Sequence, residues 1–152
     1  MITKLRRDKR ALHYKPLIIL VILDFLNKQN IFSPVIPAKI VVEEFEKIMK
    51  KIGYSKNHNK GWMPFWHLSG DNILTHYSKN HQPIKKYTFK YLKPKSKIQL
   101  LSKVNYAVID QKAIVYFNNK KNRKILATRM LKMLKKDNQI ISNKILNLMK
   151  YE

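Results

Sequence analysis

An acidic residue followed two positions later by a lysine is typical of metal-dependent nucleases of the restriction type. Asp110-Gln111-Lys112 has this spacing, and Asp71 precedes it in the chain. Two carboxylates can hold a divalent cation, which stabilises the charge that develops on a phosphate during cleavage. In a lysine-rich chain the match rests on few residues, and such acids are more often solvated residues of a turn or a helix face. A small metal-dependent nuclease that uses Asp71, Asp110 and Lys112 is therefore one hypothesis.

The histidines and the absence of cysteine argue against other reaction types. His58-Asn59 and Asn80-His81 are only fragments of a His-Asn-His nuclease, and there is no cysteine for the zinc that often braces such a domain. The three glycines form no phosphate-binding loop. The five histidines lack ligand spacing, so we expect each to be a surface or packing residue. We therefore assign no catalytic residue, no metal ligand and no cofactor.

Both tryptophans of the chain lie in one short stretch, GWMPFWHLSGDN, at residues 61–72. Phe65, Trp66 and Leu68 have polar neighbours, so some of these side chains should face the core. Met63 and Pro64 suit a buried or an exposed place equally well. A proline at the edge of a hairpin presents a rigid apolar ring beside a backbone that donates no hydrogen bond. The stretch is therefore either a core plug or an apolar contact surface.

Helices should form most of the structure around this stretch, because apolar residues recur at helical spacing over long segments. Pro16 suits the first turn of a buried helix that ends near Asn27, and Gly53 suits the C-terminal cap of a helix over 38–52. Ser96 is a candidate N-cap. The segments WMPFWHL and NILTHYS predict a short hairpin around residues 62–78. Residues 106–117 suit a helix or a strand, and 122–136 and 138–150 have the pattern of helices. We predict a mainly α (α+β) fold, one domain over residues 1–152 with a small β-hairpin.

The charge of the chain limits its partners. Thirty-two lysines and arginines against 9 aspartates and glutamates give a net charge of +23. Residues 72–152 hold 19 of the basic side chains and 3 of the acidic ones. Such a charge repels itself unless a polyanion is near. Nucleic acid is the first candidate and an anionic membrane surface the second. A general bias toward lysine would not explain why acids are so few.

The compartment is indicated by the cysteines and by the N-terminal segment. An intracellular protein fits the absence of cysteine. The apolar run at 17–23 ends at Asp24 and is followed by no small-residue cleavage site, so it predicts a buried helix, not a signal peptide or a membrane span. We expect a cytoplasmic protein that does not enter a membrane.

Three stretches occur in a familiar order: RALHYKPLIILVILDFL, MPFWHLSGDN and SKIQLLSKVNYAVIDQKAIVYFNNKKNRKILATRMLKML. Through them, residues 5–136 resemble the sulfur-binding domain of type IV, modification-dependent restriction endonucleases that recognise phosphorothioated DNA. In those enzymes a His-Asn-His nuclease domain follows the sulfur-binding domain. The resemblance implies a non-enzymatic reader of double-stranded DNA in restriction or modification sensing. No such domain follows Glu152 in this sequence, so we expect a reader without the nuclease: a stand-alone reader, an excised domain, or a subunit whose nuclease is another chain.

The resemblance also implies which residues contact the modification. A phosphorothioate keeps the charge of a phosphate, but its sulfur is larger, softer and less hydrated than oxygen. A reader therefore needs an apolar cup beside a cation. The family has an aromatic residue before the cup proline and a small or basic residue three positions after it, where this chain has Met63 and His67. Met63 is apolar and polarisable, so it suits the cup. The implied sulfur-binding residues are Arg10, Met63, Pro64 and His67, and the implied DNA-binding residues are Lys9, His13, Lys93, Lys95 and Ser96.

Three functions stay open at this point. The first is the reader of phosphorothioated duplex DNA, and the second is the metal-dependent nuclease. The third is a general DNA- or RNA-binding protein without preference for the modification, which the charge alone would support. Metal-dependent cleavage distinguishes the second function, and equal binding to modified and plain duplexes distinguishes the third.

Overall fold

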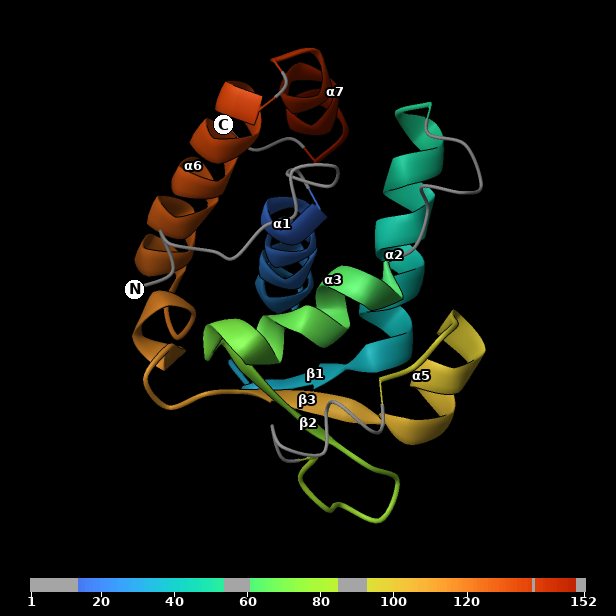
Figure 1. Cartoon of the computed structure of the whole chain (residues 1–152). Helices are drawn as coiled ribbons and strands as arrows, with labels where there is room; N and C mark the ends of the chain where they lie inside the picture. The colour runs from blue at the N-terminus through green and yellow to red at the C-terminus, as the bar shows by residue number, and fades with distance from the viewer. Residues whose placement is uncertain (1–13, 54–60, 85–92, 138, 150–152) are drawn as a thin grey trace.

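Helix α1 (Tyr14–Asn27) runs through the centre of the molecule (Figure 1). The structure is a computed structural model that describes residues 14–53, 61–84, 93–137 and 139–149. Residues 16–23 and Leu26 of α1 are buried, so the helix is covered on nearly all sides. Pro16 lies in the first turn, where a missing N–H breaks no helical hydrogen bond. The predicted buried helix is confirmed. None of the described helices is both long and apolar enough to cross a membrane.

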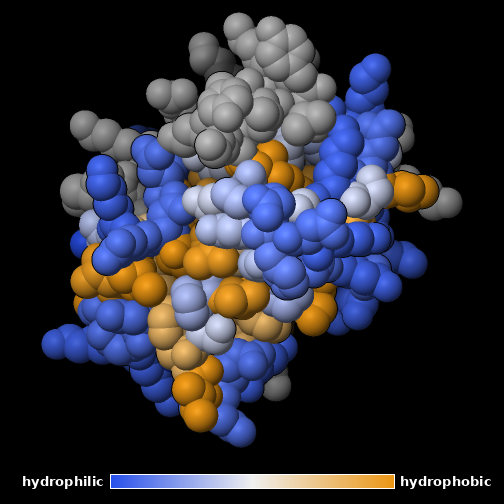
Figure 2. All heavy atoms as spheres, turned by 90° about the horizontal axis from the view of Figure 1, so that it is seen from below, coloured by the Kyte–Doolittle hydropathy of each residue, from blue (hydrophilic) through white to orange (hydrophobic). Residues whose placement is uncertain are grey.

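A small antiparallel sheet lies at one end of the molecule, below the helices in Figure 1. It consists of β1 (Val35–Pro37), β3 (Tyr106–Ile109) and β2 (Leu74–Tyr77), in this spatial order. Val35 lies opposite Val108, and Leu74 lies opposite Ile109. Seen from below, this end of the molecule shows many hydrophilic side chains with hydrophobic patches between them (Figure 2). Along β2 and β3 buried residues alternate with half-buried ones, so one face of the sheet packs on the core and the other is only partly covered.

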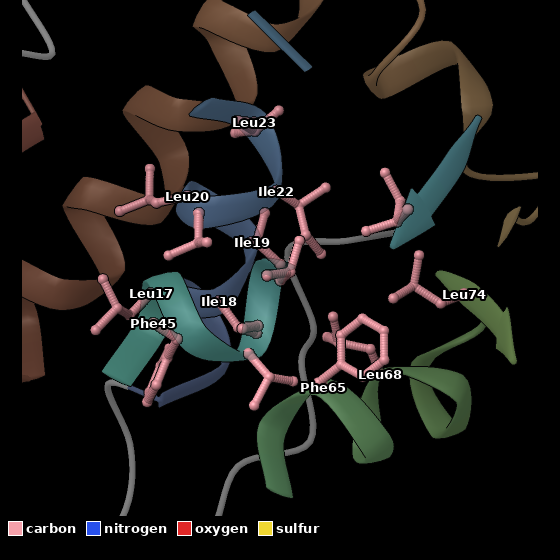
Figure 3. Packing of buried hydrophobic residues seen from close by; sticks show 14 of the residues in the cluster. Leu17, Ile18, Ile19, Leu20, Ile22, Leu23, Phe45, Phe65, Leu68 and Leu74 are labelled. Atoms are coloured by element: carbon pink, nitrogen blue, oxygen red, sulfur yellow. The ribbon is translucent and has the colours of Figure 1, made fainter. Parts of the chain in front are cut away.

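The core is one hydrophobic cluster that extends from α1 to the last helix. Figure 3 shows apolar side chains of α1 beside Phe45, Phe65 and Leu74, which come from two other helices and from β2. Burial of these side chains is the main favourable term in folding. In the described part of the chain, the other helices are α2 (Ala38–Lys51), α3 (Trp62–His67), α5 (Lys97–Lys103), α6 (Lys120–Asp137) and α7 (Gln139–Met149), with 3₁₀ helices η3 (Leu68–Asp71) and η5 (Ile114–Tyr116).

The predicted fold class, mainly helical with a small β component, is confirmed. The predicted helices over 38–52, 122–136 and 138–150 correspond to α2, α6 and α7. Gly53 follows the cap of α2 with a φ of +94°, a left-handed conformation that glycine adopts without steric strain. The ambiguous segment 106–117 contains both a strand, β3, and a 3₁₀ turn, η5.

The hairpin predicted over residues 62–78 is wrong. Its first half is helix α3, and its second half, β2, pairs with the distant strand β3. The error is one of period, because Trp62, Phe65 and Trp66 have the i, i+3, i+4 spacing of a helix and are all buried. Asn72, with a φ of +57°, then turns the chain into β2. A short hairpin does exist, but it lies later, where Tyr77 pairs with Pro83.

Candidate nucleic-acid interface

The start of helix α3 contains a glycine and a proline at positions that suit these two residue types. Gly61 precedes the helix and lies against Phe45, where an added Cβ would approach the ring at 2.7 Å. Pro64 is the third residue of the helix, so its missing N–H is one of those without a partner in the helix anyway. Trp62, Phe65 and Trp66 pack inward. The aromatic stretch is therefore largely a core plug.

One face of α3 nevertheless stays partly open. Met63 and His67 are half-buried, and their i, i+4 spacing places them on the same side of the helix. Pro64 is buried beside them. Of the two places left open for Pro64, the structure shows the buried one, on a helix and not at a hairpin edge, so the apolar surface at this position is formed mainly by Met63. We call Met63, Pro64 and His67, together with Lys15 and Lys93, the α3 surface.

His76 of β2 fixes α3 from beneath. Its Nε2 lies 3.0 Å from the carbonyl oxygen of Phe65, and its ring stacks on Trp66 with centroids 5.4 Å apart. Burial lowers the pKa of His76 to about 4, although the contact with the Phe65 carbonyl opposes this effect. The imidazole is therefore neutral at pH 7 and donates Nε2–H to that carbonyl. Among the histidines predicted to be surface or packing residues, His76 packs in the core and His81 is exposed.

A buried ion pair connects η3, which follows α3 directly, to the start of α1. The Nζ of Lys15 lies 2.6 Å from Oδ2 of Asp71, at the end of η3. The side chains are only 12% and 4% exposed, so the pair is largely removed from water. Removal of one partner by substitution would strongly destabilise the protein, because the other charge would remain buried without a partner. The pair holds the basic first turn of α1 beside the α3 surface.

His67 lies where these elements meet. Its pKa is lowered, first by burial and then by the positive charges of Lys93 and Lys15, while Asp71 opposes the shift. The lysines influence His67 because they lie near it, although they come from α1 and from the segment before α5. The imidazole of His67 is thus neutral at pH 7 within a cationic environment. The α3 surface comprises Met63, Pro64 and His67 with Lys15 and Lys93.

The segment before α5 is held by a reciprocal cap. Ser96 Oγ accepts a hydrogen bond from the backbone N–H of Gln99 at 3.2 Å, and Gln99 Oε1 accepts one from the N–H of Lys95 at 2.8 Å. The predicted N-cap at Ser96 is confirmed. Pro94 is buried, whereas Lys93 and Lys95 are exposed on either side of it. The segment therefore presents two lysines from a fixed backbone.

The predicted site residues are only partly brought together. Met63, Pro64 and His67 share α3, and Lys93 lies near His67. Lys95 is exposed on the same segment as Lys93, and the hydroxyl of Ser96 is used as a helix cap. Three predicted contacts fall outside the described residues: Lys9, Arg10 and His13.

A groove beside α3 contains candidate residues that the sequence did not reveal. It lies between α5 and the turn after β2, with a volume of about 490 Å³. Trp66 and Ile84 contribute apolar surface, and Lys79 and Lys103 contribute cations. In the sequence, only the basic turn Lys79-Asn80-His81 indicates a possible contact surface. Lys103 joins this surface only because the fold brings α5 beside the turn. The residues lining the groove are Trp66, Ser78, Lys79, Asn80, Ile84, Ser102 and Lys103.

The residues of the nuclease hypothesis have structural partners. Asp71 pairs with Lys15, and Asp110 accepts a hydrogen bond from the hydroxyl of Thr75. Lys112 is exposed on the turn after β3. Among the residues that the structure describes, no group of three or more His, Cys, Asp or Glu side chains is placed to hold a metal ion.

Comparisons with known proteins assign no family to this arrangement. Neither the protein-family models nor the curated protein sequences give a match to the chain.

Proposed function

We propose that this chain is a non-enzymatic reader of duplex DNA that distinguishes a phosphorothioate from an ordinary phosphate. The proposal follows the resemblance to sulfur-binding domains. It is supported by one observation above all: the half-buried His67, on the same side of α3 as Met63, is close enough to Lys93 and Lys15 for their charges to lower its pKa. Apolar surface next to cations is the combination that an anionic sulfur requires. In a restriction system, the bound reader would direct a nuclease on another chain.

The chemistry of the α3 surface suits sulfur better than oxygen. A phosphate oxygen is strongly hydrated and gains nothing from contact with a thioether, whereas sulfur loses little hydration there. Met63 supplies a polarisable contact, and the neutral imidazole of His67 adds an N–H donor. Lys93 and Lys15 supply the attraction to the anion, although Lys15 is already paired with Asp71. Preference for the modification then depends on α3, and charge attraction depends on the lysines.

General affinity for DNA comes from four lysines around the α3 surface, of which Lys103 is half-buried and the others are exposed. Lys93 and Lys95 come from the capped segment, and Lys79 and Lys103 come from the neighbouring groove. Such contacts to backbone phosphates position a protein without selecting a sequence. Each phosphate neutralised releases counterions, so binding must weaken as salt rises. We assign these four lysines to backbone contacts.

The decisive experiment measures binding to one duplex in three forms: plain, with a single phosphorothioate of Rp configuration, and with one of Sp configuration. Transfer of one sulfur-sized apolar surface out of water contributes about 1–2 kcal/mol, so one of the modified duplexes should bind roughly tenfold more tightly. The ratio should persist across salt concentrations while all affinities fall. Equal binding of all three duplexes would leave only a general nucleic-acid-binding protein. Incubation with Mg²⁺ or Mn²⁺ should leave every duplex intact, and cleavage that Asp110→Ala abolishes would establish the nuclease instead.

A further inference from the structure

A second basic surface lies between α6 and α7, away from α3. A groove of about 330 Å³ separates the two helices. One wall of it carries three exposed lysines of α6: Lys124, Lys132 and Lys135. Thr128 lies between the first two of them, and Asn143 of α7 adds an amide opposite. The lining also includes Ala127, Leu131 and Leu146, and the Thr128 hydroxyl donates to the carbonyl of Lys124 at 3.0 Å. The groove therefore combines the lysine cations and the Asn143 amide, which can bind phosphate oxygens, with apolar side chains.

The three lysines form a stripe with no compensating acids. Their spacings of eight and three residues place them on one side of a helix with 3.6 residues per turn. Between residues 120 and 149 the sequence contains a single acid, Asp137. Within the described part of the chain, the ion pairs involve Lys15, Lys28, Lys47 and Lys97, and none involves a lysine of this groove. Three like charges in one groove repel one another unless an anion lies between them.

We propose that this groove, the α6–α7 groove, is a second binding site for the phosphate backbone of duplex DNA. From Lys124 to Lys135 the helix extends about 16 Å. One DNA strand carries a phosphate about every 3.4 Å along its axis, so the stripe spans several successive phosphates. The proposal rests on the proposed function only in taking duplex DNA as the ligand. It does not require a preference for phosphorothioate.

A nucleic-acid backbone fits the groove better than a lipid surface. A helix that lies on a membrane carries its apolar face and its flanking lysines together. On α7 the exposed apolar residues Ile140, Leu146 and Leu148 are spread around the helix. Its one described lysine, Lys144, instead donates a hydrogen bond to the carbonyl of Ile52 at 3.3 Å. The cations of the groove lie on α6, in a concave surface that suits a strand of nucleic acid.

The α6–α7 groove and the α3 surface lie on different parts of the fold. Helix α6 packs mainly on α1 and α7, whereas α3 packs on α1, α2 and α5. Figure 1 shows α7 at the top of the molecule and α5 at the lower right. DNA in the groove is thus a different stretch from DNA at α5, either on another duplex or further along a bent one. The chain holds its target in two places.

The test uses the full chain and a plain 30-base-pair duplex. In the test variant, Lys124, Lys132 and Lys135 are changed together to glutamine. The matched control changes three exposed lysines of α2, Lys39, Lys50 and Lys51, to glutamine, with the same loss of charge. The control lysines share their helix with three acids, Glu43, Glu44 and Glu46, so this surface is not expected to meet DNA. Affinity is measured at several salt concentrations for both variants and for the unchanged chain.

We expect the groove variant to reduce the slope of log K against log salt by about 2–3, since each phosphate contact contributes about 0.9. The α2 control should change the slope by less than 1. Replacement of the same groove lysines by arginine should restore the slope of the unchanged chain. A groove variant with an unchanged slope, or one matched by the α2 control, overturns the proposal. Circular dichroism and thermal melting show that each variant is folded, and the arginine variant excludes a folding effect of the substitutions.

Vesicles of phosphatidylcholine and phosphatidylserine give the competing outcome. If the groove variant loses binding to these vesicles and keeps the salt slope on DNA, the groove is a lipid site and the proposal fails. The proposal of a phosphorothioate reader and the proposal of a DNA-binding α6–α7 groove can each fail without the other. Equal binding to plain and phosphorothioate duplexes would end the reader hypothesis but leave the salt slope of the groove variant to be measured. An unchanged slope would end the groove hypothesis but leave the preference ratio intact.

Discussion

The α3 surface and the α6–α7 groove are both basic, but they are built in opposite ways. The α3 surface depends on groups withdrawn from water: the Lys15–Asp71 pair, the neutral His67 and the buried His76 that holds the helix. The groove is lined by exposed lysines on a helix that packs through its other side. One surface needs the fold to place every group, whereas the other needs only a helix with the right spacing.

This difference separates two tasks in recognition of a polyanion. Exposed lysines attract any phosphate, and their contributions add up with little dependence on geometry. Discrimination between sulfur and oxygen requires an apolar contact and a defined cation at one place, which only a rigid, partly desolvated surface provides. Changes at the α3 surface should therefore alter stability and preference, and changes in the groove should alter affinity alone.

Asp71→Asn should destabilise the protein by about 3 kcal/mol, because it leaves the charge of Lys15 in a place that is largely closed to water. Chemical denaturation measures the loss. The matched control is Glu46→Gln, which breaks the Lys97–Glu46 pair of similar length, 2.9 Å, but with side chains 35% and 25% exposed. That change should have an effect within about 1 kcal/mol. Similar losses in both variants would contradict a special structural role of the buried pair.

The pH dependence of stability should reveal His76. Its folded-state pKa of about 4 lies below its ordinary value of 6.5, so the unfolded chain binds more protons between these values. Stability must then fall as pH falls through this window, with a loss of about 3 kcal/mol by pH 4. Thermal or denaturant unfolding at several pH values measures this loss.

The control for His76 uses a second histidine. His76→Gln should flatten the fall in stability between pH 6.5 and pH 4, although it also weakens packing at every pH. His81→Gln, at an exposed residue of the neighbouring turn, should retain the fall. If the His76 variant shows the same pH dependence as the unchanged chain, another group causes the fall in stability. The assignment of a neutral, buried His76 beneath α3 is then wrong.

The long helices could be predicted from the sequence, whereas the parts that build the α3 surface could not. α2, α6 and α7 repeat their apolar spacing over several turns, and α1 is indicated by its continuous apolar run after Pro16. Helix α3 has six residues, too few for a helical period to be told from alternation. The pairing of β2 with β3 joins residues far apart in the chain, and no local pattern announces it.

The same reasoning explains which site residues were found. The resemblance predicts Met63, Pro64, His67 and Lys93, because it compares whole segments of the chain. The partnership of Lys15 with Asp71 and the support from His76 are tertiary contacts between residues with no motif in common. The sequence suggests Asp71 only as a metal ligand of a nuclease, because an isolated acid in a sequence does not indicate which cation it pairs with in the fold.

Met63→Gln should remove the preference for phosphorothioate, about tenfold, and leave binding to plain duplex nearly unchanged. Glutamine has a similar size, and Met63 is half-buried, so the fold should tolerate it. Met133→Gln, at a half-buried methionine of α6, is the matched control and should keep the preference. A folded Met63 variant with its preference intact would show that sulfur is not read at this face of α3.

The smallest expected effect concerns His67 and the pH dependence of binding. Its pKa is lowered by burial and by Lys93 and Lys15 in the free protein. A phosphate bound at the α3 surface offsets these positive charges, so the pKa of His67 rises in the complex. The complex then holds more protons than the free protein, and affinity increases as pH falls from 7.5 toward 5.5. The effect stays below about tenfold for each unit by which the pKa rises.

His67→Gln should bind DNA with an affinity that changes less over this pH range, and isothermal titration in two buffers of different ionisation enthalpy should show less proton uptake. A short duplex is used, because a long one also contacts the α6–α7 groove. The comparison of the two surfaces then becomes sharp. The groove triple glutamine variant should lower affinity equally at every pH and keep the proton uptake. A pH response that survives in the His67 variant would mean that another group takes up the proton and that His67 does not sense a phosphate bound at the α3 surface.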